Sequence, residues 1–389
     1  MTTRSHTKGL ASVLILALGT FAVGTDAFIV AAFLPSMADG LGVMTAMAGQ
    51  SMTVFAVAYA LLAPIIATFT ATVPRRRLLI AALLLLGLAN IGSALAPSFA
   101  ILIVTRIVAA AAAAAYTPNA GAAAAQLVGL EQRGRALAIV IGGLSASTAL
   151  GVPLGHVAST FLDWRASLAL VGAVAFMAMI GVAWRMPHLS GAMPLSLGRR
   201  LALLKQPRVM IVLPLTVLGM MACYVPFAFA LPVLEALFVP AGLATAMLLC
   251  YGFGAITGNY ASGMLSDRAR PFVVLVGAYL LLAACYSALL SLSLLETASH
   301  VVLIGLLIFG WGAASWSQTP PQQLRLIAAA PDQAPVVIAL NSSAIYAGVG
   351  LGSAIGGATI GHGAGATLAA GLGIGLLALI YAIVTRRSA

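Results

Sequence analysis

Long apolar segments without charged loops inside them make up most of this 389-residue chain. Twelve such segments can be drawn, at residues 10–38, 44–73, 77–96, 98–128, 135–161, 165–187, 208–238, 241–266, 271–294, 299–328, 333–361 and 363–385. A membrane-spanning helix needs about 20 apolar residues, whereas the strands of a membrane barrel are shorter and alternate in polarity. The segments here are long and do not alternate. The sequence therefore predicts an all-α integral membrane protein with twelve transmembrane helices.

The small charged fraction also argues against a soluble fold. Only 7% of the residues are charged, whereas a soluble domain has about 25%. Because the mean hydropathy is +1.10, the chain cannot cover a water-facing surface with polar side chains. All three cysteines lie inside apolar segments, so we interpret them as buried apolar residues and expect neither a disulfide nor a metal site.

The positions of the basic residues predict how the chain crosses the membrane. Of the 19 lysines and arginines, 17 fall on one side of the predicted membrane, in the termini and in alternate loops. Arg165 lies on the other side together with Asp39, Asp163 and Glu296, and Arg106 lies inside a segment. The positive-inside rule then places both termini in the cytoplasm. This topology accounts for the net charge of +11, so we expect no nucleic-acid partner.

The longest connection lies near the middle of the chain and separates two sets of six segments. The predicted organisation is an N-terminal six-helix bundle, a basic linker with a short surface helix and a C-terminal six-helix bundle, at residues 1–187, 188–207 and 208–389. The two halves are similar in detail, since Asp26 lies nine residues before Pro35 and Cys223 lies nine residues before Pro232. Two parallel six-helix halves with a binding site between them are typical of secondary transporters.

Asp26 lies in the middle of the first apolar segment, where a carboxylate costs about 2.5–3.5 kcal/mol to insert. Arg106 is the only basic residue in the interior of a segment, away from its ends, so its side chain needs a partner. A direct or water-bridged pair with Asp26 is one expectation, and hydrogen bonds to backbone carbonyls are the other. We interpret Asp26 as the residue that carries a coupling proton, with Arg106 in a coupling role. The alternative for Asp26 is a buried structural carboxyl, and no cofactor other than protons is expected.

Six polar or aromatic residues at intermediate depth are candidates for a substrate cavity. They are Tyr59, Asn119, Tyr224, Asn259, Trp311 and Asn341. As a set they suit a mostly apolar cavity with a few polar anchors, which is the usual form of a small-molecule site. The alternative for each residue is helix packing or an interhelical hydrogen bond. Asn341 is the strongest candidate because of the motif that contains it.

Four sequence motifs resemble those of the major facilitator superfamily, and within it those of the twelve-helix drug–proton antiporters. The motifs are GTDAFIVAAFLP at residues 24–35, PRRRLL at 74–79, ALGVPLG at 149–155 and ALNSSAIYAGVGLGSAIGG at 339–357. In that order they are similar to the signature of the first helix, the basic loop after helix 2, the antiporter signature of helix 5 and helix 11. Over nearly its whole length the chain resembles the arabinose or sugar efflux permeases and the chloramphenicol-resistance proteins.

The resemblance implies a proton-coupled antiporter that exports small organic molecules, such as drugs or sugars, by alternating access. It also implies a monomer in the inner membrane of a bacterium. The residues that match gating motifs are Arg75, Arg76, Gly151, Pro153, Gly155, Asp267 and Arg268. The chain departs from the loop motif in its first half, where no acid precedes the arginines, whereas the second half retains Asp267 before Arg268.

Other functions compete with export. Uptake of a sugar or metabolite, by proton coupling or by facilitated diffusion, is the main alternative, because one acid and one arginine do not decide the direction of transport. An intramembrane enzyme would need converging catalytic groups, such as paired acids or a nucleophile with its base. The segments contain no such set, so we predict that the protein is not an enzyme. A receptor or scaffold is disfavoured because the sequence shows no large soluble domain.

Overall fold

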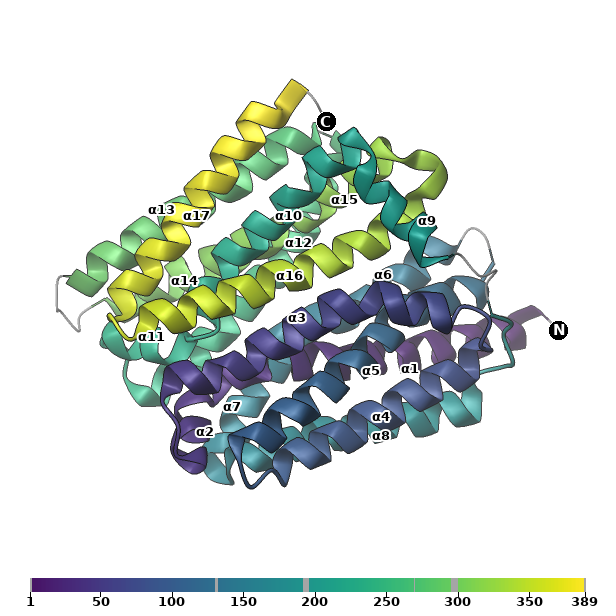
Figure 1. The fold of residues 1–389 in the computed structure, drawn as a ribbon, viewed down its shortest axis with the longest axis horizontal. Helices are drawn as coiled ribbons and strands as arrows, with labels where there is room; N and C mark the ends of the chain where they lie inside the picture. The colour runs from purple at the N-terminus through teal and green to yellow at the C-terminus, as the bar shows by residue number, and fades with distance from the viewer. Residues whose placement is uncertain (1, 130–131, 192–195, 269, 295–299, 388–389) are drawn as a thin grey trace.

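The structure is a computed structural model that describes residues 2–129, 132–191, 196–268, 270–294 and 300–387 (Figure 1). Within these ranges all regular secondary structure is helical. Twelve helical segments are long and apolar enough to cross a membrane, which is the predicted number. The prediction of an all-α membrane protein with twelve transmembrane helices is therefore confirmed.

The helices form two groups, which occupy mainly the lower and upper halves of Figure 1. The first group contains α1 (Thr2–Phe28), η1 (Ile29–Ala32), α2 (Leu34–Leu41), α3 (Thr45–Phe69), α4 (Arg75–Ala94), α5 (Phe99–Gln126), α6 (Arg133–Ala146), η3 (Ser147–Gly151), α7 (Val152–Phe161) and α8 (Trp164–Arg185). The second group contains α10 (Pro207–Phe227), α11 (Ala230–Ala236), α12 (Ala244–Arg268), α13 (Pro271–Leu294), α14 (Val301–Ser317), α15 (Thr319–Ala329), α16 (Ala334–Ile360) and α17 (Ala364–Val384). The short helix α9 (Leu197–Ala202) lies in the connection between the groups.

The first helix of each group breaks where the sequence suggested a continuous span. The predicted ends at residues 38 and 238 are wrong, because α1 stops at Phe28, α10 stops at Phe227, and the short helices α2 and α11 follow. Pro35 and Pro232 lie in the first turns of these short helices, where a residue without a backbone N–H is tolerated. The breaks therefore occur at matching places in the two halves.

The fifth span contains a further irregularity. A π-helical turn, Ser147–Gly151, joins α6 to α7, and Pro153 follows it in the first turn of α7. Because proline cannot donate a hydrogen bond to the preceding turn, a regular α-helix would be interrupted here, and a π turn is a common way to accommodate the interruption. The π-helical turn lies against α1.

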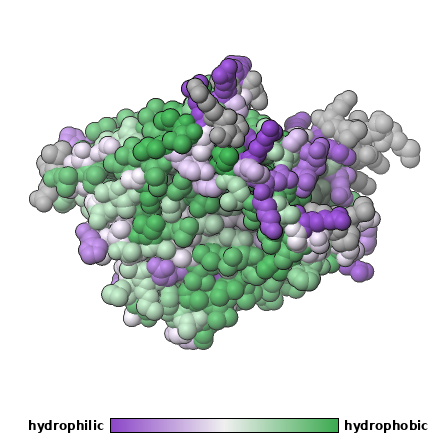
Figure 2. Space-filling model, turned by 45° about the horizontal axis from the view of Figure 1, so that its top comes forward, coloured by the Kyte–Doolittle hydropathy of each residue, from purple (hydrophilic) through white to green (hydrophobic). Residues whose placement is uncertain are grey.

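The outer surface is largely apolar, and hydrophilic residues gather at one end of the molecule (Figure 2). Large apolar side chains point outward, among them Trp184 at 84% and Phe161 at 81% exposure, as suits contact with lipid. Two arginines lie near helix ends at one end of the molecule. Arg76 donates to the carbonyl of Ala183 near the end of α8, and Arg200 donates to the carbonyl of Ala67 near the end of α3. We call the end that holds Arg76 and Arg200 the basic end, and the opposite end of the molecule the far end.

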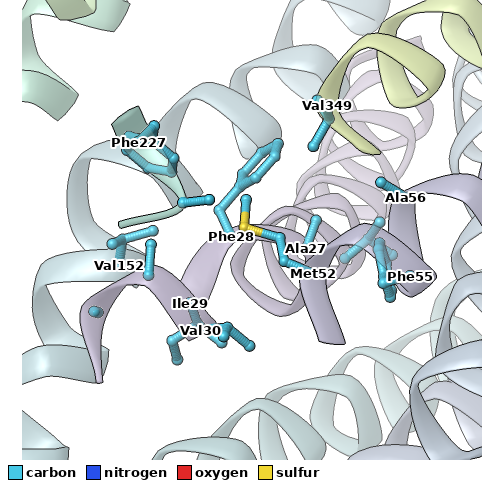
Figure 3. Close-up of a cluster of buried hydrophobic side chains, with 14 of the residues drawn as sticks. Ala27, Phe28, Ile29, Val30, Met52, Phe55, Ala56, Val152, Phe227 and Val349 are labelled. Atoms are coloured by element: carbon cyan, nitrogen blue, oxygen red, sulfur yellow. The ribbon is translucent and has the colours of Figure 1, made fainter. Parts of the chain in front are cut away.

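Side chains from both groups meet in a buried hydrophobic cluster (Figure 3). Phe28, Phe55 and Val152 come from α1, α3 and α7 of the first group, and Phe227 and Val349 come from α10 and α16 of the second. Beside this cluster, α3 runs along α16 and α12 packs on the π-helical turn. The two groups are therefore in contact at the centre of the molecule.

At the far end, Phe229 closes the space between α3 and α16. Its side chain is fully buried. A Cβ placed on Gly49 of α3 would lie 2.5 Å from an atom of its ring, and one placed on Gly356 of α16 would lie 2.9 Å from it. Glycine at these positions lets both helices approach the phenyl ring closely, as small residues do in membrane helix interfaces.

Candidate functional site

Asp26 and Arg106 form an ion pair in the middle of the first group of helices. Nη1 of Arg106 lies 2.5 Å from Oδ1 of Asp26, and Nη2 donates to the backbone carbonyl of Asp26 at 2.7 Å. Both side chains have 0% exposure. The direct pair and the bond to a backbone carbonyl, which the sequence left as alternatives, thus occur together at one residue.

The end of α1 makes this geometry possible. A helix leaves its last carbonyls without partners inside the helix, and α1 ends at Phe28, two residues after Asp26. Arg106, on α5, supplies a donor to one of these carbonyls. Its guanidinium also lies over the ring of Phe55 on α3, with Cζ 4.6 Å from the ring centroid, an arrangement that favours a cation. Contacts from two other helices therefore hold the arginine in place.

One oxygen of the carboxylate remains available. Oδ2 of Asp26 is buried and has no hydrogen-bond partner among the described residues, and the same is true of Nε of Arg106 and Oγ1 of Thr25. An ionised carboxylate accepts hydrogen bonds at both oxygens, so Oδ2 has unused capacity. This atom can accept a proton, or a donor group of a ligand, without first displacing another protein group.

The helix 5 motif packs against α1 beside Asp26. A Cβ on Gly151 would meet the side chain of Thr25, and a Cβ on Gly155 would meet the side chain of Ile29. Both glycines therefore permit close contact on either side of the acid. Pro153 lies between them and follows the π-helical turn. The structure thus brings the motif to the ion pair, while its role in gating stays a prediction.

Aromatic rings from both groups lie next to the ion pair. The ring of Phe28 lies 5.3 Å from that of Tyr224 on α10, measured between centroids. It lies 6.4 Å from the rings of Phe227 and of Trp316. Tyr224 was predicted to line a cavity, and the structure instead packs it among these rings with 1% exposure. The last turn of α1 is therefore joined to the second group through aromatic contacts.

A second aromatic contact separates the ion pair from the basic end. Tyr59 of α3 stacks on Tyr346 of α16, with centroids 3.7 Å apart and planes 25° from parallel. Along α3, Phe55 touches Arg106, Tyr59 follows one turn later, and Ala63 lines a cavity after that. The stacked tyrosines consequently lie between the ion pair and the cavity.

The cavity has a volume of about 200 Å³ and extends from Tyr59 toward the basic end. It is lined by residues of α3, α5, α9 and α16 and by the start of α4. Its polar lining includes Asn119, Arg75, Arg200 and Ser343. Of the six predicted cavity residues, Tyr59 and Asn119 line it.

Asn341, the strongest candidate from sequence, lies outside this cavity. Its Oδ1 accepts a hydrogen bond of 2.8 Å from Oγ1 of Thr216, which joins α16 to α10, so the alternative of an interhelical bond applies. Trp311 packs edge-on against Tyr251 at 5.1 Å in an apolar region, and Asn259 is half-buried on α12. In this structure the six residues therefore do not line one common cavity.

The arginines of the first basic loop contact other helices. Nη1 of Arg75 donates to Oδ1 of Asn119 on α5. Arg76 donates to a carbonyl of α8 and lies 3.4 Å from Nε2 of His188. In the second half, Arg268 is exposed at the end of α12, and the side chain of Asp267 lies outside what the structure describes. Bonds between Arg75, Arg76 and neighbouring helices are compatible with the predicted gating role without testing it.

The second half has an uncharged counterpart of the ion pair. Cys223, which matches Asp26 in the repeat, receives a hydrogen bond of 3.4 Å at its sulfur from Nε2 of Gln318. Gln318 lies at the break between α14 and α15, in the fourth span of its half, as Arg106 lies in the fourth span of the first half. The same contact between first and fourth helices is thus made with charges in one half and without charges in the other.

Sequence reasoning missed several residues that the structure places here. Tyr346 was not selected, although it lies in the quoted helix 11 motif, and a search for a tyrosine opposite Tyr59 would have found it. Arg200 was counted only as a linker charge, and no local signal shows that α9 folds back onto the cavity. Phe28 carries no signal other than its distance of two residues from Asp26.

Comparison with known proteins agrees with this architecture. Residues 16–353 match the family model described as Major Facilitator Superfamily. The chain is 32% identical to the chloramphenicol resistance protein of Streptomyces lividans, over 90% of this chain and 89% of that protein. It is 30% identical to the inner membrane transport protein YdhP of Escherichia coli (strain K12), over 95% of this chain and 92% of that protein.

The fold comparison agrees as well. A D-xylose–proton symporter superposes with a TM-score of 0.77, covering 96% of this chain and 97% of the symporter, at 15% sequence identity. At that identity the likeness concerns the fold alone. With a family match over most of the chain and relatives at 30% identity or more over nearly its full length, this chain belongs to the major facilitator superfamily and is a transport protein rather than an enzyme.

Proposed function

We propose that this protein exports small organic molecules in exchange for protons, by alternating access. The observation that carries the proposal is the buried Asp26 carboxylate. Arg106 holds it through Oδ1, and its Oδ2 has no hydrogen-bond partner among the described residues. Ionisable side chains inside membrane spans commonly serve proton or ion pathways. Asp26 is the only one of the eight acidic residues of the sequence that lies within one of the twelve described spans.

In the proposed cycle, a proton binds to Oδ2 of Asp26 and neutralises the carboxyl. The neutral carboxyl no longer balances the charge of Arg106, so the hold between α1 and α5 weakens. Because Asp26 lies two residues before the break in α1, loss of this contact frees the last turn of α1 and its Phe28 ring. Rearrangement of the contacts between Phe28 and the second group then favours the other orientation of the carrier.

The basic end is the cytoplasmic side in this proposal, in the inner membrane of a bacterium. Support comes from the arginine-rich loops, since cytoplasmic loops carry an excess of Lys and Arg. A relative at 30% identity is named an inner membrane transport protein. The cavity at the basic end is then the entry for exported molecules, and Phe229 closes the far end in this conformation.

Export is favoured over uptake by the helix 5 motif next to Asp26 and by the relative named as a chloramphenicol resistance protein. Uptake with protons is the second candidate, and the fold of the D-xylose–proton symporter is compatible with either direction. The two candidates need pH gradients of opposite sign. Antiport into proteoliposomes requires an acidic interior, whereas symport into them requires an acidic exterior.

The test is transport into proteoliposomes with an imposed pH gradient of either sign, using chloramphenicol, ethidium and L-arabinose as probes. We expect at least one probe to accumulate only with an acidic interior. Asp26→Asn should abolish this accumulation while it retains exchange of labelled for unlabelled probe without a gradient. Asp39→Asn, which alters an exposed acid of α2, is the matched control. Gradient-driven accumulation that persists in Asp26→Asn, or that needs an acidic exterior, would contradict the proposal.

A further inference from the structure

The polar lining of the cavity at the basic end is cationic. Two arginines, Arg75 and Arg200, line it, and no aspartate or glutamate among the described residues does. The ion pairs found among the described residues are those of Arg106 with Asp26 and of Arg165 with Asp163, so neither cavity arginine has an acidic partner there. The cavity therefore holds positive charge that the described protein groups do not balance.

Arg75 is the more deeply placed of the two. Its exposure is 8%, and its Nη1 donates to the neutral amide oxygen of Asn119. The amide nitrogen of Asn119 donates to the carbonyl of Ala115 at 2.7 Å, which fixes the orientation of the amide. Nε of Arg75 is buried and has no hydrogen-bond partner among the described residues. A buried charge without a counter charge is unfavourable, and an anion bound in the cavity would relieve it.

Arg200 reaches the same cavity from a different part of the chain. It lies on α9, and its Nη2 makes a hydrogen bond of 3.3 Å to the carbonyl of Ala67. Its Nε is also buried without a partner among the described residues. Partial burial lowers the pKa of Arg200 from its ordinary value, and no carboxylate among the described residues offsets this effect.

The rest of the lining suits the body of an organic anion. Ser342 and Ser343 of α16 add hydroxyl groups, while Tyr59, Ala63 and Leu340 add an aromatic face and apolar wall. The volume of about 200 Å³ is below the 300–1,000 Å³ of sites that enclose drug-sized molecules. The cavity is therefore of a size to hold the charged end of a molecule and a small apolar part.

From these observations we infer that the cavity binds an anionic group, a carboxylate or a phosphate, between Arg75 and Arg200, and that the exported molecules include organic anions. Arginine suits this task because its planar set of N–H donors matches the oxygens of carboxylate and phosphate. The assignment to exported molecules rests on the proposed function, whereas binding itself does not. The same chemistry is present in the head group of an anionic lipid, and the experiment separates the two sources.

The test is calorimetric titration of the purified full-length protein in phosphatidylcholine nanodiscs, at one pH and without a gradient. The probes are benzoate and phenyl phosphate, with benzamide as the uncharged match. We expect an anionic probe to bind at least tenfold more tightly than benzamide. Arg200→Gln should weaken that binding by about tenfold or more, since bonds to charged groups contribute strongly. Arg199→Gln, which alters an exposed neighbour on the same helix, should leave it unchanged.

Further experiments separate anion binding from misfolding, from lipid binding and from proton coupling. Arg75→Lys retains the buried charge, so it should lose less anion affinity than Arg75→Gln when both variants elute as folded protein. If either variant does not fold, Arg200→Gln still tests the inference, because Arg200 lies outside the spans. Equal binding of benzamide, or no effect of Arg200→Gln, would overturn the inference. Loss of benzoate binding in phosphatidylglycerol nanodiscs would assign the cavity to lipid instead. Asp26→Asn should retain anion binding, so failure of proton coupling leaves this inference standing.

Discussion

Replacement of Arg106 by glutamine should strongly destabilise the protein, because it leaves the Asp26 carboxylate buried without a counter charge. Two unit charges about 4 Å apart interact by about 4 kcal/mol at an effective dielectric constant of 20. Removal of one partner of a buried pair costs about 3–5 kcal/mol in measured cases. Both side chains here have 0% exposure, and hydrogen bonds of 2.5 and 2.7 Å are lost with the guanidinium. We therefore expect a loss of about 3–5 kcal/mol.

The double variant Asp26→Asn, Arg106→Gln is the informative comparison. It removes both charges and keeps two side chains that can form hydrogen bonds with each other, so that neither side chain is left as a buried charge without a counter charge. The double variant should therefore be more stable than Arg106→Gln alone, with a coupling energy of about 2–3 kcal/mol.

The measurement is the unfolding free energy of wild type, both single variants and the double variant in one detergent, with Arg199→Gln as an exposed control. The control should change stability by less than about 0.5 kcal/mol. If the losses of the two single variants simply add in the double variant, the two side chains are not coupled, and the reasoning from the ion pair is refuted.

Three further predictions concern contacts between helices. Tyr346→Ala removes a stacked ring worth about 0.5–1.5 kcal/mol and should raise the proton leak of proteoliposomes, which the exposed replacement Tyr260→Ala should not. Gly258→Ala should destabilise by about 1–3 kcal/mol, because its Cβ would meet the backbone of α14, as thermal unfolding can show. Gly263→Ala on the same helix should instead be neutral or stabilising by up to about 1 kcal/mol, because no described atom outside the neighbouring helix backbone lies within 4 Å of the new Cβ. Thr216→Val should lower stability by about 1–3 kcal/mol, because it leaves a buried asparagine oxygen of α16 without its hydrogen-bond donor. It should not change the KM for transport, because that asparagine lies outside the cavity.

The contact between Asp26 and Arg106 was within reach of sequence reasoning for a simple reason. In an apolar medium each charge needs a partner, and the first half offered one acid and one base in the interior of its spans, away from the span ends. The number of spans was accessible because segment length and hydropathy respond directly to membrane thickness.

Other features depend on information that a local pattern does not carry. The break after Phe28 lies within a continuous apolar run, where hydropathy does not distinguish a helix from a 3-10 turn. The stacking of Tyr59 on Tyr346 depends on how the two groups meet. The position of Arg200 at the cavity depends on how α9 folds back. The sequence around Asn341 does not show whether its side chain faces a cavity or is bonded to Thr216, so the asparagine was interpreted as a cavity residue.

The uncharged contact of Gln318 with Cys223 bears on the energetics of pumping. With one acid inside the described spans and a cysteine at the matching position of the other half, the proposed cycle moves one proton per turnover. A single charge crossing 100 mV releases about 2.3 kcal/mol. For a neutral substrate that energy supports a concentration ratio of about 50 per 100 mV, at 1.36 kcal/mol for each factor of ten. In this cycle, the residues at the matching positions 26 and 223 set the number of protons per turnover. That number sets the steepest substrate gradient that the carrier can maintain.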